Sequence, residues 1–197
     1  MQEQESAKIF RQIMQGMKFY HSKNIAHRDI KPENILVDMN NPDLTTKIID
    51  FGFAAQSLRK MDVFCGTPAY MSPEICNKEK YSGPATDMWA TGILLYTILF
   101  GSQPFRASNE KDLFRKIISG KYHTPALTAR DRSASRSPAR SPRLSPLRPS
   151  PSRPRLGQQT DPNVRFKEYR HIKNVGTIRE LLAEILTTKE DSRLTAD

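Results

Sequence analysis

Residues 25 to 52 constrain the fold more than any other stretch, because two polar clusters alternate there with two short apolar runs. The clusters are His27 to Asn34 (HRDIKPEN) and Asp50 to Gly52 (DFG), and the runs are Ile35 to Val37 and Lys47 to Ile49. Residues 40–43 (NNPD) favour a turn between the runs. The sequence therefore predicts two short β-strands joined in a hairpin, with both polar clusters at one edge, facing one cavity.

The residue types in these clusters suit phosphoryl transfer, in which a protein mainly positions groups and offsets phosphate charge. Asp29 could orient an attacking hydroxyl, and Lys31 could neutralise the transferred phosphoryl group. Asn34 and Asp50 could hold magnesium, which takes oxygen ligands and usually shares them with phosphates. An isolated Asp-Phe-Gly indicates only a turn, but here it follows Asn34 by sixteen positions, and the combination is far more specific.

These clusters resemble the catalytic loop and the aspartate-phenylalanine-glycine motif of eukaryotic protein kinases. Lys31, two residues after the aspartate, resembles the serine/threonine branch of that family. The resemblance implies an α+β, kinase-like fold with a mainly helical large lobe and a short catalytic-loop hairpin. It also implies ATP and Mg²⁺ as cofactors, with Asn34 and Asp50 on the metal and with Leu36, Lys31, Asn34 and Asp50 on the nucleotide.

Residues 50–74 resemble the activation segment of such kinases. Within it, Cys65 to Tyr70 (CGTPAY) resembles the loop that receives the residue after the target hydroxyl. The resemblance implies that Thr67 bonds the catalytic aspartate and lysine, which completes a catalytic set of Asp29, Lys31, Asn34 and Thr67; the alternative is an ordinary turn threonine. Residues 66–75 and 87–101 are most similar to calcium/calmodulin-dependent and AMP-activated-type kinases.

Control of this segment departs from the family pattern. An arginine at the position of Arg28 usually pairs with a phosphorylated residue, whose charge orders the segment. The usual phosphate acceptor lies two residues before Cys65, and here that residue is Val63, which has no hydroxyl. Asp62, Ser57 or another mechanism would substitute for the phosphate, or none would.

Apolar periodicity predicts amphipathic helices over residues 6–22, 109–119 and 177–188. The run from Met88 to Phe100 is shorter than the roughly 20 residues of a membrane span, so we expect a buried helix. By resemblance, Asp87 caps the start of this helix and bonds back to the catalytic loop, and Arg193 pairs with Glu74. The expected core positions of the buried helix are Trp89, Ile93, Leu94, Leu95 and Ile98.

The net charge of +10 comes mainly from one segment, because residues 130–155 hold eight arginines and one acid. We predict that residues 124–160 are a disordered Arg/Ser/Pro-rich insertion, between kinase-like residues 1–123 and 161–197, since they cannot bury enough apolar surface. Its Ser-Pro pairs, at Ser137, Ser141, Ser145 and Ser150, are candidate sites for proline-directed kinases. A solvated linker and an RNA-binding segment are the alternatives.

The resemblance covers the large lobe of a kinase, because no glycine-rich phosphate loop occurs in the sequence. We therefore expect a fragment or a natural truncation with its small lobe missing, and no phosphoryl transfer by these 197 residues alone. The first hypothesis is a serine/threonine protein kinase that uses ATP; the second is a catalytically inert scaffold or interaction module.

The expected partners are proteins with target Ser or Thr hydroxyls. The resemblance implies that Glu33 favours basic residues N-terminal to the target. We expect neither a membrane partner nor nucleic acid binding by the kinase-like part. Isolated cysteines, Cys65 and Cys76, and a polar N-terminus without a secretory signal indicate an intracellular protein, cytoplasmic or nuclear.

Overall fold

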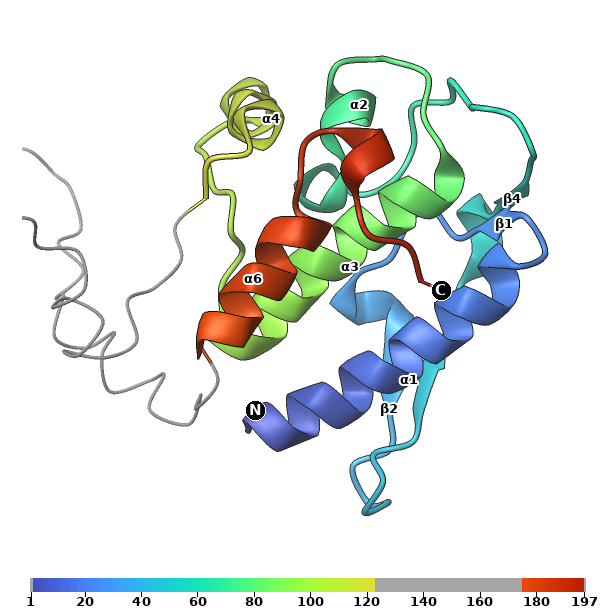
Figure 1. The fold of residues 1–197 in the computed structure, drawn as a ribbon, viewed down its shortest axis with the longest axis vertical. Helices are drawn as coiled ribbons and strands as arrows, with labels where there is room; N and C mark the ends of the chain where they lie inside the picture. Colours follow the sequence, from blue (N-terminus) through green and yellow to red (C-terminus); the bar gives the residue numbers. More distant parts are fainter. Residues whose placement is uncertain (1, 123–174, 197) are drawn as a thin grey trace, which may run out of the picture. The chain divides into compact units, whose positions relative to one another are not determined.

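The computed structural model describes residues 2–122 and 175–196, which are mainly helical (Figure 1). They belong to one unit of the chain, made of residues 1–125 and 171–197. The predicted insertion at 124–160, with its disorder, its boundaries and its four Ser-Pro sites, lies outside the described residues. Those parts of the domain prediction stay predictions.

Helix α1 (Glu3–His21) forms the N-terminal side of this unit. Its first turn is stabilised by the Glu5 carboxylate, which accepts a hydrogen bond of 2.8 Å from the Gln2 backbone N–H. Ile9, Ile13 and Met17 form a buried stripe at helical spacing, as predicted. The helix packs against α3 and against strand β3 of the hairpin.

Helix α3 (Gly83–Phe100) is apolar nearly all round and forms the centre of the core. Trp89, Ile93, Leu94 and Leu95 are buried as predicted, but Ile98 is only half-buried and Leu99 takes the buried position. Consecutive helix positions point about 100° apart, so a register estimated from sequence easily errs by one residue.

The prediction that Asp87 caps α3 is wrong. The helix begins one turn earlier, after Ser82, because Pro84 is favoured in a first helical turn, where its missing N–H has no partner to lose. Asp87 therefore lies inside the helix, and its carboxylate is fully buried. The second half of that prediction, a bond back to the catalytic loop, is confirmed below.

Helix α6 (Val175–Ile185) lies along α3 (Figure 1). Gly92 permits this approach, since a Cβ there would lie 2.5 Å from Ile185 Cγ2 and 2.8 Å from Leu186 Cδ2. The predicted helix over 177–188 is thus confirmed with bounds moved toward the N-terminus, and Leu182 is fully buried. The predicted helix over 109–119 is α4 (Glu110–Ser119), which packs against the short helix α2 (Pro73–Cys76).

Two antiparallel pairs of strands complete the described part of the chain. Strand β2 (Ile35–Val37) pairs with β3 (Thr46–Ile48), with Ile35 opposite Ile48. The predicted hairpin is confirmed, with its second strand one residue earlier. Strand β1 (Ile25–Ala26) pairs with β4 (Ala55–Gln56), which joins the start of the catalytic loop to the activation segment.

Within the described residues, four single turns of 3₁₀ helix link these elements: η1 (Pro32–Asn34), η2 (Phe51–Phe53), η3 (Pro68–Tyr70) and η4 (Glu190–Ser192). The mainly helical architecture with few strands agrees with the predicted fold class, whereas the missing small lobe stays a prediction. No helix among residues 2–122 and 175–196 combines the length and apolarity that a bilayer crossing needs.

Candidate active site

The turn at His27 and Arg28 is fixed by the buried Asp87 carboxylate. Asp87 Oδ2 accepts from the His27 backbone N–H at 2.8 Å, and Oδ1 accepts from the Arg28 backbone N–H at 2.7 Å. The side chain of His21 adds a third contact at 3.0 Å from its Nε2. These bonds hold Arg28 at a φ of 67°, a conformation that non-glycine residues rarely adopt, and so direct the next residue, Asp29, inward.

His27 connects this turn to the second polar cluster. Its Nε2 lies 2.9 Å from the Ile49 carbonyl oxygen, and its Nδ1 lies 3.3 Å from the Asp29 backbone nitrogen. A carbonyl only accepts and a backbone N–H only donates, so Nε2 is the donor to Ile49 and Nδ1 is the acceptor from Asp29. The ring also packs against Phe51 with a centroid separation of 4.7 Å, which ties the catalytic loop to the Asp-Phe-Gly turn.

Asp29 is the centre of the site, and its side chain is bonded at both oxygens. Oδ1 accepts from the Thr67 hydroxyl at 2.7 Å and from the Thr67 backbone N–H at 3.1 Å. Oδ2 lies 2.6 Å from Lys31 Nζ and accepts from Asn34 Nδ2 at 3.3 Å. Lys31 Nζ also donates to Thr67 Oγ1 at 2.9 Å, which closes a triangle of Asp29, Lys31 and Thr67.

The charge state of Asp29 follows from this triangle. Burial by itself would raise the pKa of the carboxyl group, but the bonds from Lys31 and Thr67, with the positive charge of Lys31, outweigh burial and hold the pKa below its usual range. Asp29 is therefore an ionised carboxylate at neutral pH although only 3% of the residue is exposed. An anionic acceptor that protein donors hold in place can orient a hydroxyl group.

Asn34 and Asp50 lie next to each other across the hairpin, because the Ile49 backbone N–H donates to the Asn34 carbonyl oxygen at 2.9 Å. Asn34 is buried, and its Nδ2 donates to the Asp29 carbonyl oxygen at 2.8 Å, which fixes the orientation of the carboxamide. Asp50 is exposed and has a φ of 61°. The backbone bond of Ile49 to Asn34 therefore brings the main chain of Asp50 close to Asn34, and the Asp50 carboxylate accepts from the Gly52 N–H at 3.2 Å.

This pair of oxygen donors fits a hard cation that takes its other ligands from phosphates and water. Within residues 2–122 and 175–196, no three His, Cys, Asp or Glu side chains form a group that could hold a metal ion by themselves. A cation at Asn34 and Asp50 would therefore depend on ligands from its substrate.

Gly66 brings Thr67 to Asp29. Its φ is 107°, and a Cβ at this position would lie 2.8 Å from the Arg28 carbonyl oxygen, so only glycine fits without a shift of the backbone. The predicted contact of Thr67 with the aspartate and the lysine is present in the structure. The predicted nucleotide contacts of Leu36, Lys31, Asn34 and Asp50 stay predictions; Leu36, which is 54% exposed on β2, offers an apolar surface two residues after Asn34.

The activation segment is held by contacts that the sequence did not predict. Tyr81, only 1% exposed, donates from its hydroxyl to the Val63 carbonyl oxygen at 2.7 Å. Arg28 makes no ion pair with a described residue; its Nε donates to the Phe53 carbonyl oxygen at 2.6 Å, and Nη1 donates to the Tyr81 hydroxyl at 3.4 Å. Neither Asp62 nor Ser57 contacts Arg28: Asp62 is exposed and Ser57 donates to the Arg59 carbonyl oxygen.

The predicted pair of Glu74 and Arg193 is confirmed as a buried double contact. Arg193 Nη1 donates to Glu74 Oε1 at 2.7 Å, and Nη2 donates to Oε2 at 3.1 Å. Arg193 also donates to the Ala85 carbonyl oxygen at 2.8 Å, and its guanidinium lies 5.2 Å from the centre of the Trp89 ring. The pair therefore connects the end of the activation segment to α3 and to the C-terminal part of the chain.

Sequence reasoning missed Tyr81 and His21. The chain has six tyrosines and four histidines, and nothing in the local pattern marks these two, because their partners lie far away in sequence. A usable signal would have been that Tyr81 directly precedes the Ser82 cap of α3, beside the predicted activation segment.

Comparison with known proteins gives the same picture as the geometry. The family model described as the protein kinase domain matches residues 1–197. The chain is 43% identical over 127 residues to NUAK family SNF1-like kinase 1 of Mus musculus and of Homo sapiens, which covers 64% of this chain. It is 44% identical over 126 residues, 63% of this chain, to the probable serine/threonine-protein kinase HSL1 of Saccharomyces cerevisiae. It spans only 19% of the first two relatives and 8% of the third.

Proposed function

The chain belongs to the protein kinase domain family, and from this premise we propose that the protein transfers the γ-phosphate of ATP to serine or threonine hydroxyls of proteins. The prediction of a serine/threonine-kinase family member is confirmed, and the expected AMP-activated-like subgroup agrees with the SNF1-like relatives. Because the chain spans a small part of those relatives, the activity of the whole protein is our inference.

One observation carries this proposal: the ionised Asp29 carboxylate bonded to Lys31 and Thr67. Four protein donors reach Asp29 Oδ1 and Oδ2, at 2.6, 2.7, 3.1 and 3.3 Å, and together they fix the orientation of the carboxylate. It would accept a bond from the incoming hydroxyl and orient it, which is the positioning that phosphoryl transfer requires. Lys31 beside it would offset the charge of the transferred group.

Asn34 and Asp50 would hold magnesium, and ATP phosphates would complete its ligands; the ion would neutralise phosphate charge. The Asn34 carboxamide is fixed by its bond to the Asp29 backbone carbonyl. This bond would keep the metal ion at a constant distance from the Asp29 carboxylate that accepts from the hydroxyl. Leu36 would contact the apolar part of the nucleotide. These assignments rest on the general use of ATP and Mg²⁺ by protein kinases.

The protein substrate would meet Glu33, which is exposed on η1 next to Asn34. An exposed carboxylate at this place could pair with a basic side chain of the substrate, so we propose a preference for arginine or lysine N-terminal to the target hydroxyl. We also propose an intracellular location, since Cys65 and Cys76 are free thiols.

The test is phosphate transfer by the full-length protein, assayed with radiolabelled ATP and a serine peptide that carries N-terminal arginines. Asp29→Asn should lower kcat by roughly 10²–10⁴-fold and leave the KM for ATP unchanged, because Asp29 does not hold nucleotide. Asp50→Asn should also weaken binding of magnesium and ATP. Asp43→Asn, an exposed change at the hairpin turn, is the control.

Equal transfer by the wild type and Asp29→Asn would contradict the proposal and favour the inert scaffold. Loss of ATP affinity alone in both variants would show that the roles of Asp29 and Asp50 are wrongly assigned. A Glu33→Gln variant that keeps the same preference for basic peptides would remove the substrate assignment.

A further inference from the structure

The activation segment must place Thr67 on Asp29, yet most of the residues before Thr67 are exposed. Leu58 is 87% exposed, and Val63 and Phe64 are each about half exposed at 53% and 51%. A segment with so few buried side chains has little packing energy of its own. Its position therefore depends on a small number of anchoring contacts.

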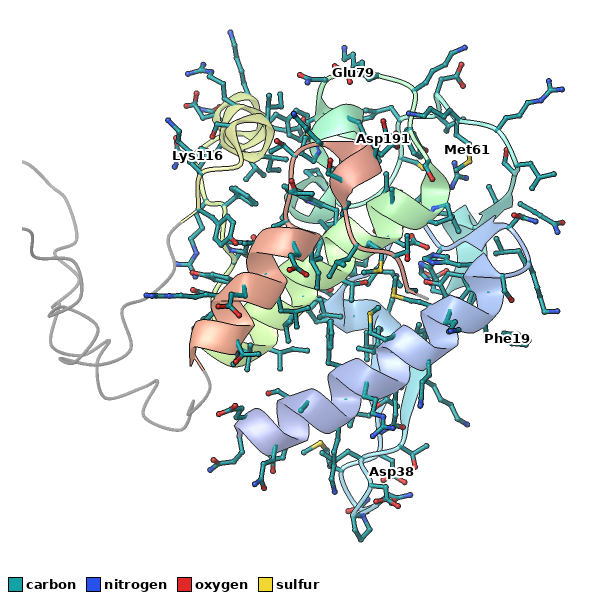
Figure 2. All side chains as sticks on the ribbon, in the orientation of Figure 1. Phe19, Asp38, Met61, Glu79, Lys116 and Asp191 are labelled. Atoms are coloured by element: carbon teal, nitrogen blue, oxygen red, sulfur yellow. The ribbon has the colours of Figure 1, made fainter. Side chains whose placement is uncertain are left out.

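The main anchor is Tyr81, at the start of α3. Its backbone forms a two-bond bridge with Met61: the Met61 N–H donates to the Tyr81 carbonyl oxygen at 2.8 Å, and the reverse bond is also 2.8 Å. Figure 2 shows Met61 beside the beginning of α3. The Tyr81 hydroxyl donates to the Val63 carbonyl oxygen, so one residue holds the segment at two points.

The same hydroxyl connects the segment to the catalytic loop. Arg28 Nη1 donates to it at 3.4 Å, while Arg28 Nε donates to the Phe53 carbonyl oxygen nearer the Asp-Phe-Gly turn. Arg28 directly precedes Asp29 in the catalytic loop, and Val63 belongs to the activation segment, which also carries Thr67. The Tyr81 hydroxyl, which bonds both Arg28 and Val63, therefore connects the catalytic loop to the activation segment. Tyr81 thus lies between the two parts whose alignment forms the site.

A second anchor supports the first. The Glu190 carboxylate accepts from Lys60 Nζ in the segment and from the Ser82 backbone N–H at the start of α3. Gly83 lies in close contact with the Met61 side chain, since a Cβ at position 83 would come within 2.6 Å of Met61 Cε. Both contacts place residues 60 and 61 on the same end of α3.

Phosphate commonly orders such a segment by adding charge that an arginine can bind. Here Arg28 donates to the Tyr81 hydroxyl in place of a phosphate, and the Tyr81 hydroxyl in turn donates to the backbone carbonyl oxygen of Val63. The contacts in this structure need no negative charge on the segment.

We propose that Tyr81 is a positioning residue that holds residues 61–67 over Asp29, so that the segment is in place for transfer without a phosphate on it. The proposal rests on the kinase function proposed above and adds its regulation. Removing the hydroxyl should loosen the segment and weaken use of the protein substrate, whereas nucleotide binding should be unaffected.

The experiment compares full-length wild type, Tyr81→Phe and Tyr122→Phe, with Asp29→Asn as the inactive reference. Tyr81→Phe keeps the buried ring and loses a hydroxyl bonded to a carbonyl; it should lower kcat/KM for the peptide about tenfold with the KM for ATP unchanged. Tyr122→Phe removes a hydroxyl far from the segment, since Tyr122 packs against Tyr96 and Phe105, and should act as wild type.

Amide exchange gives a readout independent of activity. The Thr67 N–H donates to Asp29 Oδ1, so its exchange reports the alignment of the segment with the catalytic loop. In Tyr81→Phe, exchange over residues 62–67 should rise about tenfold, while exchange in α3 should match wild type. Phosphatase treatment of the wild type should leave peptide kcat/KM within about twofold.

Each alternative result has a separate meaning. If wild type transfers no more phosphate than Asp29→Asn, the proposed function fails, and the exchange rates then decide the role of Tyr81. If wild type is active and Tyr81→Phe equals it in peptide kinetics and exchange, Tyr81 does not position the segment. Loss of activity on phosphatase treatment, with phosphate found within residues 57–67, would show that the segment needs a phosphate.

Discussion

The catalytic loop and the activation segment meet at Asp29, but they are held in different ways. In the loop, His27, Asp29, Ile30 and Asn34 are buried, and the buried carboxylate of Asp87 accepts two of its backbone N–H groups. The segment around residues 57–64 exposes much of Leu58, Val63 and Phe64 to solvent, whereas Met61 is half-buried. It is held by hydrogen bonds to Asn24, to Tyr81 just before α3 and to Glu190 on η4, and by a ring contact of Phe64 with Phe114 of α4.

This difference matches the two tasks that the proposed phosphoryl transfer would set. The part that orients charge must be rigid, because small displacements of a positioning group greatly reduce the rate. The part that receives a protein substrate gains from being easy to open, and such elements come from the less stable regions of a fold. We therefore expect substitutions in the loop to affect folding and chemistry, and substitutions in the segment to affect mainly substrate use.

The largest effect should come from Asp87→Asn, which disrupts the hydrogen bonds that hold the rigid catalytic loop. The amide keeps one acceptor but turns a donor toward a backbone N–H, so a buried N–H of His27 or Arg28 loses its partner. We expect the free energy of unfolding to fall by about 2–4 kcal/mol, measured by urea unfolding.

The matched control for Asp87→Asn is Asp43→Asn, the same change at an exposed position on the hairpin turn. Surface changes of this kind usually alter stability by less than about 0.5 kcal/mol. Equal losses for the two variants would mean that the loop does not depend on its buried carboxylate.

The second effect concerns the junction between the two regions. Gly66→Ala places a Cβ 2.8 Å from the Arg28 carbonyl oxygen at a φ of 107°, so Thr67 must move away from Asp29. We expect a loss of about 1–3 kcal/mol in transition-state stabilisation, measured as peptide kcat/KM. Gly101→Ala has a φ of 62° with no atom within 4 Å of the new Cβ, so it should cost about 1 kcal/mol of stability and leave kcat/KM unchanged.

The two regions also differ in how far sequence predicted them. Asp29 and Lys31 were identified because the proposed reaction restricts which residue types can act and because their spacing is specific. Thr67 was identified through the resemblance to the activation segment of kinases. The hairpin was predicted to within one residue, because turn-forming residues between two apolar runs leave few alternatives.

The anchoring of the activation segment could not be predicted in the same way. Tyr81 acts through a hydroxyl that meets Val63, eighteen positions away, and Lys60 pairs with Glu190 across 130 positions. These contacts depend on where the fold brings α3 and η4, and no local periodicity encodes that. The start of α3 was misjudged for a different reason: Asp87 was assigned as the cap from the resemblance to kinases, whereas the helix begins after Ser82 with Pro84 in its first turn.

A third, smaller effect should be a pH dependence of the stability that Asp29 gives to the catalytic loop. The pKa of Asp29 is lower in the folded protein than in an unfolded chain, because of its bonds to Lys31 and Thr67. Its ionised form therefore contributes stability that is fully present above the unfolded pKa of about 4 and is lost as the pH falls through the lower folded value. The difference in unfolding free energy between wild type and Asp29→Asn should shrink on acidification from pH 6 to pH 3. A constant difference would contradict the role of charge at Asp29.

The smallest effect should come from the side chain of Val63, on the loosely held side. Tyr81 bonds the backbone carbonyl of Val63, and the Val63 side chain itself is 53% exposed. Val63→Thr and Val63→Glu should therefore change peptide kcat/KM by less than about twofold, because exposed side chains without partners contribute little. The Glu variant adds the charge that a phosphate would bring near Arg28, and the Thr variant adds a hydroxyl that could be phosphorylated. A tenfold gain in either variant would mean that the segment is only partly ordered by Tyr81 and still responds to negative charge at this position.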